Sequence, residues 1–459
     1  MNNNHDDLKI LTWYERNKQI ISLKEFDRKS VNEDYGDIYW ELNNYPRASQ
    51  LVQIEELIID GKRHLIFSAG SKVGLEKTGP FTVFVSPKIN DTDFLTMVNY
   101  AYDFQINLDK EAAKVEQKPQ NLTAIFIKYF LIQLQKFLNH ELKRSFVKNE
   151  QYLQSKIKGK VMLSPYLTSC VTKTKDTTIP CRFYEIQVDC LENQIIRYTA
   201  EIIRIVIPHL VLSTTFRKEL TYLSNRVLQK MEAISFKRIS PGDFNRIRYT
   251  GRFKNYRHIH ELCQLMIQAA KTQMKAGKET FQGFSIDMNA LFEKFIIGVL
   301  KKETGLKVIP QKESKFLIEN NIKGIRVDGW LPQQKLVFDT KYKEAFEPYR
   351  ENDVTNLGPV KVLNTDIYQI VAYCNHHFFK NSTGVLVYPT STEPPNGSSY
   401  YSVKGFNQSI YIISFNINFE QPRKKPKEIN DFVATFLELI NTHPDNQDLL
   451  SPPHGRRHA

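Results

Sequence analysis

Two strand-like segments joined by a short turn constrain this chain more than any other feature. Residues Gly324–Leu331 and Lys335–Tyr342 are rich in β-branched and aromatic residues, and Pro332-Gln333-Gln334 separates them. Two such runs around a short turn are typical of neighbouring antiparallel strands. Helical spacing of apolar residues predicts one helix before this pair, over Met288–Lys302, and another after it, over Asp366–His377. This succession of helices and strands favours an α/β arrangement for the C-terminal part of the chain.

The second of the two segments changes from apolar to charged residues within a few positions. It continues its apolar start with Asp339 and Lys341. Because side chains alternate along a strand, these two residues share one face, opposite Phe338 and Thr340. Charged groups at the end of an apolar strand are costly to bury unless something compensates them. If the segments form a hairpin, Asp328 in the first segment lies close to Asp339.

Two carboxylates and a lysine held together predict metal-assisted hydrolysis. Neighbouring carboxylates repel one another, and a hard divalent cation relieves the repulsion. Mg²⁺ accepts one or two carboxylates while it keeps several waters, and Mn²⁺ is the alternative ion. Such an ion polarises a phosphoryl oxygen and activates a water, and a nearby lysine can stabilise the developing charge. Asp328, Asp339 and Lys341 are therefore candidate residues for phosphodiester hydrolysis.

Polar residues in the two flanking helices extend this candidate site. Glu293 lies within the apolar helical segment upstream, where it is either a third acidic group that reaches the metal or a half-exposed residue paired with a base. Downstream, Asp366, Gln369 and Tyr373 fall on one helical face. Gln369 and Tyr373 either contact the DNA backbone, support Lys341 or serve ordinary packing.

The order of these residues resembles the PD-(D/E)xK nuclease superfamily, with Glu293 on a helix, then Asp328, Asp339-Thr340-Lys341 and Gln369. The segments 339–343 and 366–373 are similar to McrC, the nuclease subunit of McrBC-type restriction systems that act on modified (5-methylcytosine) DNA. Several segments of the middle region resemble the same family: Lys158–Val161, Cys181–Glu185, Asp189–Asn193 and Tyr249–Arg257. The resemblance spans most of residues 80–425. Val327 stands where the family often has a proline, which is not a metal ligand.

The resemblance implies a metal-dependent endonuclease controlled by a partner. Asp328, Asp339 and Glu293 would hold the metal, Lys341 would position the attacking water or stabilise the transition state, and Gln369 would support the site. The partner would be a McrB-like AAA+ GTPase hexamer that binds GTP and whose hydrolysis this chain stimulates, and the substrate would be methylated or otherwise modified DNA. The chain has no GxxxxGK[ST] motif for binding nucleotide itself.

Two other functions stay open from the sequence. A non-cleaving adaptor would dock on the AAA+ GTPase and activate it, and a plain DNA-binding protein would need only a basic surface. The net charge of +13 favours a polyanionic partner without choosing among these functions.

The fold class expected is α+β with several domains. The expected domains are a β-rich N-terminal domain at 1–110 that contacts the partner, a mainly helical middle domain at 111–280, a C-terminal α/β domain like that of restriction endonucleases at 281–425, and a final helix and tail at 426–459. A hairpin is expected at Asp60-Gly61.

Composition favours the cytoplasm. No run of apolar residues approaches the length of a membrane span, and the polar N-terminus has no secretory signal. The five cysteines never form CxxC, which favours reduced thiols. Zinc is not expected at His258-x-His260 or at Cys374-x-His376-His377, because neither supplies four ligands.

Overall fold

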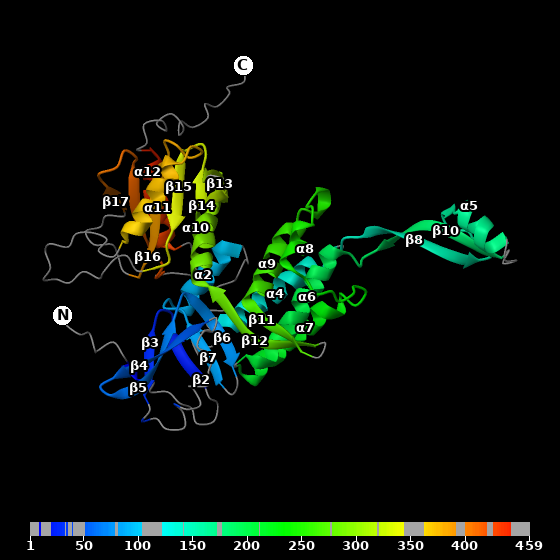
Figure 1. Ribbon diagram of the computed structural model, residues 1–459, viewed down its shortest axis with the longest axis horizontal. Coiled ribbons are helices and arrows are strands. Elements are labelled where there is room, and N and C mark those ends of the chain that lie inside the picture. Colours follow the sequence, from blue (N-terminus) through cyan, green and yellow to red (C-terminus); the bar gives the residue numbers. More distant parts are fainter. Residues whose placement is uncertain are drawn as a thin grey trace, which may run out of the picture. The chain divides into compact units, whose positions relative to one another are not determined.

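The computed structural model describes residues 9–10, 20–32, 34, 39, 51–78, 81–102, 122–140, 142–171, 177–210, 212–275, 278–318, 321–343, 362–391, 400–419 and 426–441 (Figure 1). The chain is mixed α+β and divides into two compact units. The first combines Met1–Leu122 with Ser285–Ala459, and the second is Thr123–Phe284. The four domain ranges expected from the sequence stay a prediction, and the expected tail lies outside the described residues.

Short strands build the N-terminal part of the first unit. They are β1 (Lys9–Ile10), β2 (Ile20–Lys24), β3 (Arg28–Asn32), β4 (Val52–Ile59), β5 (Lys62–Ala69), β6 (Lys72–Thr78) and β7 (Phe81–Ser86). One sheet has the order β1-β3-β5-β4, and β7 lies between β2 and β6 in another. Asp60 and Gly61 have φ angles of 51° and 78°. Two left-handed residues match the right-handed twist of the strands, and the expected hairpin between β4 and β5 is confirmed.

Helix α2 (Asp91–Tyr102) packs against helix α10 (Met288–Thr304) within the first unit. The rings of Tyr100 and Phe295 meet edge to face with centroids 6.0 Å apart. The Tyr100 hydroxyl donates a 2.8 Å hydrogen bond to Glu303. At Gly298 the backbones are so close that an added Cβ would lie 2.2 Å from the Tyr100 carbonyl oxygen. The two helices, which are nearly two hundred residues apart in the chain, are therefore tightly apposed.

A further sheet of the first unit carries the C-terminal strands. They are β13 (Ile309–Ile318), β14 (Asn321–Leu331), β15 (Leu336–Thr340), β16 (Thr383–Thr390), β17 (Tyr400–Val403) and β18 (Ile410–Asn416). Their order is β13-β14-β15-β16-β18-β17. The β14–β15 pair is antiparallel, as expected, while β15, β16 and β18 run parallel. Strand β13 was missing from the sequence expectation.

Helices cover both faces of this sheet (Figure 1). On one face, α11 (Asn364–Asn375) places Ile370 and Cys374 in a core with Leu386 of β16. On the other face, Phe415 of β18 stacks on Phe432 of α12 (Lys427–Asn441) with ring centroids 4.4 Å apart. Consecutive residues of β15 alternate between the two cores: Val337 lies in the core with α11, whereas the Phe338 ring meets the Phe436 ring of α12.

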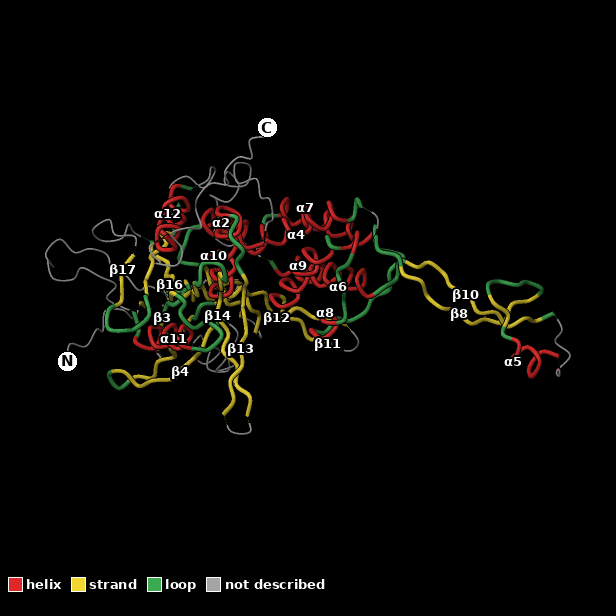
Figure 2. The backbone as a smooth tube through the Cα atoms, turned by 90° about the horizontal axis from the view of Figure 1, so that it is seen from above, coloured by secondary structure: helices red, strands yellow, loops and turns green. Residues whose placement is uncertain are grey.

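In its described residues the second unit contains helices and antiparallel strand pairs (Figure 2). The longer helices are α4 (Leu122–Phe137), α6 (Leu191–Val206), α7 (Thr214–Gln229) and α9 (Tyr256–Ala269), and α5 (Leu163–Pro165) and α8 (Pro241–Asn245) are short. One antiparallel pair joins β8 (Ser145–Gln154) to β10 (Thr178–Gln187), which also pairs with β9 (Lys160–Val161), and the other joins β11 (Ala270–Lys275) to β12 (Lys278–Asp287). The region 111–280, expected to be mainly helical, also contains these strand pairs, which the sequence did not predict. Much of the β8–β10 ribbon is exposed, so its strands lack the regular apolar alternation of half-buried strands.

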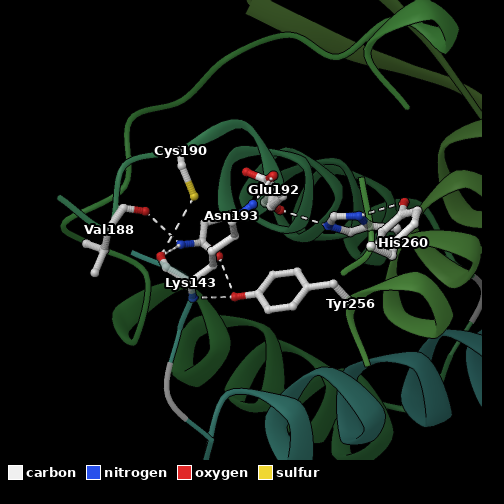
Figure 3. A network of polar contacts seen from close by, with 8 residues as sticks. Lys143, Val188, Cys190, Glu192, Asn193, Tyr256 and His260 are labelled. Atoms are coloured by element: carbon white, nitrogen blue, oxygen red, sulfur yellow. Dashed lines mark hydrogen bonds and ion pairs between the residues drawn. The ribbon is translucent and has the colours of Figure 1, made fainter. Parts of the chain in front are cut away.

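A buried polar network joins the helices of this unit (Figure 3). The Asn193 amide donates to the carbonyl oxygens of Lys143 at 2.9 Å and Val188 at 2.7 Å. The Tyr256 hydroxyl donates to Asn193 Oδ1 at 2.8 Å and accepts from the Lys143 backbone N–H at 2.6 Å. Satisfied buried polar groups fix one arrangement of the chain. The middle-region segments that contain Asn193 and Tyr256 therefore have a structural role here.

His260 belongs to the same part of the core. It is 1% exposed, and its Nε2 lies 2.9 Å from the Glu192 carbonyl oxygen. Because a carbonyl only accepts, Nε2 carries the proton, and Nδ1 accepts from the Tyr249 hydroxyl at 3.1 Å. Burial lowers the pKa of His260 to about 4. The imidazole is therefore a neutral core group.

No helix within the described ranges is both long enough and apolar enough to cross a membrane.

Candidate functional site

A pocket of about 440 Å³ lies in the first unit, where β14, β15, α10 and α11 meet. Its lining is strongly polar. The described residues that line it are Asp287, Asn289, Ala290, Glu293, Arg326, Asp328, Asp339, Thr340, Lys341, Tyr342, Lys343, Gln369 and Tyr373. The five site residues expected from the sequence, Asp328, Asp339, Lys341, Glu293 and Gln369, thus line one pocket.

Strand register brings the two aspartates together. Gly329 pairs with Phe338 across the antiparallel β14–β15 ladder, and one further step along that register sets Asp328 opposite Asp339. The Thr340 backbone N–H and hydroxyl both donate to Asp328 Oδ2 at 2.8 Å. These two bonds fix the Asp328 carboxylate against the end of β15.

Asp339 is the most buried acid of the pocket, at 2% exposure. Its Oδ2 lies 2.6 Å from Lys341 Nζ, an ion pair without the alignment of a hydrogen bond. Burial and then the nearby Asp328 charge together raise the pKa of Asp339 to about 7, against the opposing effect of Lys341. Lys341 therefore does not fully offset the effects of burial and of the Asp328 charge on Asp339.

Lys341 is held from two sides. Its Nζ donates to Gln369 Oε1 at 2.8 Å, and Gln369 Nε2 donates to the Tyr373 hydroxyl at 2.5 Å. Burial lowers the pKa of Lys341, but the charges of Asp339, Asp366 and Asp328 outweigh it and raise the pKa above its usual value. The lysine is therefore a fixed, charged donor in contact with the helical face predicted to support it.

Glu293 lines the same pocket from α10. Gln311 Nε2 donates to its Oε1 at 3.0 Å. Burial raises the pKa of Glu293, and the Asp328 charge adds to the effect, so the two carboxylates are close enough to repel.

The donor set fits a hard divalent cation. Asp339 contributes a buried oxygen without an aligned hydrogen bond, and Asp328 contributes a second carboxylate that repels it. In the part of the chain that the structure describes, no three His, Cys, Asp or Glu side chains are already gathered as a metal cage. Mg²⁺ needs no such cage, because it usually takes one or two carboxylates and completes its shell with water.

Three lining residues were missed from the sequence. Arg326 lies two residues before Asp328, so the alternation of β14 could have placed both on one face. Asp287 and Asn289 enter from the start of α10, where Asp287 accepts from the Asn289 backbone N–H at 3.0 Å. Only the fold brings this helix start to the pocket, and the sequence around it carries no signal.

Comparison with known proteins identifies the family. A family model described as "McrBC 5-methylcytosine restriction system component" matches residues 68–389. The chain belongs to this family. No curated protein sequence matches this McrBC-family chain.

Two solved structures are similar to the McrBC-family chain. One is a half-complex from a tetradecameric assembly of Thermococcus gammatolerans McrB AAA+ hexamers with bound McrC, with a TM-score of 0.52 and 16% identity, covering 92% of this chain and 100% of that chain. The other is the Thermococcus gammatolerans McrBC complex, with a TM-score of 0.39 and 19% identity, covering 62% of this chain and 88% of that chain. At 16% identity the first likeness concerns the fold.

Proposed function

We propose that this McrBC-family chain is the nuclease subunit of a modification-dependent restriction system. It hydrolyses DNA phosphodiester bonds with Mg²⁺, or Mn²⁺ in its place, when it is assembled with a McrB-like AAA+ GTPase hexamer. It also stimulates that GTPase, which binds the GTP. The observation that carries the proposal is the convergence of Asp328, Asp339 and Lys341 in one polar pocket, in the order typical of PD-(D/E)xK nucleases.

Each residue has a distinct task in this proposal. Asp328 and Asp339 hold the metal, and Glu293 joins them directly or through a water. The bound ion supplies polarisation of the phosphoryl oxygen and a water of lowered pKa. Lys341, anchored by Gln369, donates to the attacking water or to the negative charge that develops on the phosphate.

An exposed apolar surface supports the assembly with a partner. In the β8–β10 ribbon, Phe146 pairs with Ile186, and Tyr184 lies two residues further along the same face. Their exposed fractions are 72%, 57% and 65%. Large apolar side chains gathered on one exposed face mark an interaction site. We assign this face to the AAA+ ring, in keeping with the McrB hexamers that bind McrC in the Thermococcus structure.

The same surface also favours the second candidate function, a non-cleaving adaptor that activates the GTPase. Docking through the ribbon needs no working pocket, so GTPase stimulation alone does not distinguish the two functions. Cleavage does.

The test combines the purified chain with its AAA+ partner, GTP and Mg²⁺, on plasmids with and without 5-methylcytosine. Cutting that requires the partner, GTP and the modified base supports the nuclease. Faster GTP hydrolysis without cutting supports the adaptor and contradicts the nuclease. A Phe146→Ser/Ile186→Ser variant should lose GTPase stimulation, and Tyr222→Ser, an exposed aromatic of α7, is the matched control.

A further inference from the structure

A second lysine lines the pocket beside Lys341. Lys343 follows at the end of the β15 segment, where its backbone N–H donates to the Lys341 carbonyl oxygen at 2.9 Å. Its side chain is 33% exposed and lines the pocket. Its partners in the structure define its role.

The buried carboxylate of Asp366 forms an ion pair with Lys343. Its Nζ lies 2.5 Å from Asp366 Oδ2, and the Tyr388 hydroxyl donates to the same oxygen at 2.7 Å. Asp366 is 6% exposed and Tyr388 is fully buried. Asp366 does not appear among the described residues that line the pocket. Its direct contact with a lining residue of the pocket is the ion pair with Lys343, while its charge also reaches Lys341.

A helix start and a neighbouring strand both act on the Asp366 carboxylate. It lies in the first turn of α11, where the positive end of the helix dipole favours a carboxylate. Tyr388, on the neighbouring strand β16, sets the orientation of the carboxylate by its hydrogen bond. The pair is thus an oriented anionic partner that holds the Lys343 ammonium by an ion pair, while Lys343 lines the pocket.

The acidic residues that line the pocket oppose the entry of a polyanion. Its described lining sets the carboxylates of Asp287, Glu293, Asp328 and Asp339 against the cations of Arg326, Lys341 and Lys343. Lys341 is already engaged by Asp339 and Gln369. A polyanion that enters this pocket meets repulsion unless another cation is directed at it.

We propose that Asp366 and Tyr388 form a positioning pair that presents Lys343 to a DNA phosphate at the cleavage site. This inference rests on the proposed nuclease function and deepens it by assigning a phosphate contact to the same pocket. Lysine binds phosphate as a point charge through charge-assisted hydrogen bonds. Its effect on the reaction therefore depends on where the ammonium is held, which Asp366 and Tyr388 determine.

The binding test uses a labelled DNA duplex and the full chain in EDTA, so that no cleavage occurs. Lys343→Met keeps the apolar stem and removes the charge. It should lower the slope of log affinity against log salt by about one, because one phosphate contact is lost. Lys404→Met, an exposed lysine between β17 and β18, is the matched control and should leave the slope nearly unchanged. An unchanged slope in Lys343→Met overturns the proposal.

The cleavage test separates positioning from a merely structural role. In the assembled complex with Mg²⁺ and GTP, Asp366→Asn should keep or tighten DNA binding, because it removes a negative charge. It should slow single-turnover cutting roughly ten- to a hundredfold, because the lysine is no longer held. Tyr388→Phe should do the same more weakly. Equal losses of binding, cutting and melting temperature would overturn the positioning role.

A double variant gives the sharpest readout. If Asp366 acts through Lys343, Lys343→Met/Asp366→Asn should cut no more slowly than Lys343→Met alone. Additive losses contradict the proposal. If the wild-type complex cuts and Lys343→Met cuts normally, this inference fails while the nuclease function stands. If the wild-type complex does not cut, the nuclease function fails, and the salt slope still decides whether Lys343 contacts phosphate.

Discussion

The hydroxyl of Tyr342 donates a 2.8 Å hydrogen bond to the buried carboxylate of Glu25, a residue 317 positions away in the chain. Glu25 is fully buried, and its Oε1 also accepts from the Lys88 backbone N–H at 2.7 Å. Tyr342 lines the pocket beside Lys341. The segment that follows β2 therefore contacts the segment that follows β15, next to the pocket.

Removing this hydrogen bond should destabilise the first unit. Tyr342→Phe deprives a buried carboxylate of a donor, which costs about 1–3 kcal/mol in the free energy of unfolding. Denaturant unfolding of the full chain measures the loss.

Glu25→Gln is the matched variant, because it keeps an acceptor for Tyr342 and removes the charge. Burial raises the pKa of Glu25, so the folded state holds the proton to a higher pH than the unfolded state does. Stability from this group is present at low pH and is lost as the pH rises above the unfolded value. The glutamine variant should therefore match or exceed wild-type stability at pH 8. A large loss there would contradict the account.

Metal binding should be measurable without DNA or partner. Mg²⁺ or Mn²⁺ that binds only the folded chain raises its melting temperature by mass action. The rise should be seen in the wild type and be absent in Asp339→Asn, which lacks the buried charged ligand. Glu303→Gln, an acid of α10 bonded to Tyr100, is the control and should keep the rise. Equal rises in wild type and Asp339→Asn would refute the ligand assignment.

Acid should destabilise the second unit through His260. Its pKa is lowered to about 4 in the folded state, whereas an unfolded histidine titrates near 6.5. As the pH falls below that value, the unfolded state takes up a proton first, and stability declines until the folded pKa is reached. From pH 7.5 to pH 5 the loss should be about 2 kcal/mol. His260→Gln should show a smaller decline between these two pH values, as read from denaturant midpoints.

Gly298→Ala should destabilise the α2–α10 contact. Alanine favours an exposed helix interior over glycine by about 1 kcal/mol. Here the added Cβ would lie 2.2 Å from the Tyr100 carbonyl oxygen, and a backbone atom has little room to move. Overpacking of about 1–3 kcal/mol should therefore outweigh the helix propensity. Gly242→Ala in α8, which meets only Ser240 Oγ at 3.8 Å, should be neutral or stabilising in the same thermal unfolding measurement.

The sequence predicts the local geometry of the pocket better than its surroundings. Strand alternation and a hairpin register are short-range rules, and they place Asp328 opposite Asp339 and put Lys341 on the same face. Helical spacing likewise predicts that Gln369 and Tyr373 share a face. These predictions need only a few consecutive residues on each element.

Long-range partners could not be predicted in the same way. Nothing in the sequence near Glu25 points to Tyr342, because their contact joins the segment after β2 to the segment after β15 and exists only in the folded first unit. The pairing of Lys343 with Asp366 similarly depends on where α11 starts relative to β15. The β8–β10 ribbon was missed because much of it is exposed, so it lacks the apolar alternation that marks a half-buried strand.

The central claim is that the Asp328–Asp339–Lys341 pocket cuts DNA. The most direct measurement records plasmid cleavage and GTP hydrolysis in one assembled reaction, for the wild type and for Asp339→Asn and Lys341→Met. The account predicts that both variants keep GTPase stimulation, since the ribbon is untouched, and lose at least about a hundredfold in cleavage rate. Cleavage at the wild-type rate by Asp339→Asn would contradict it.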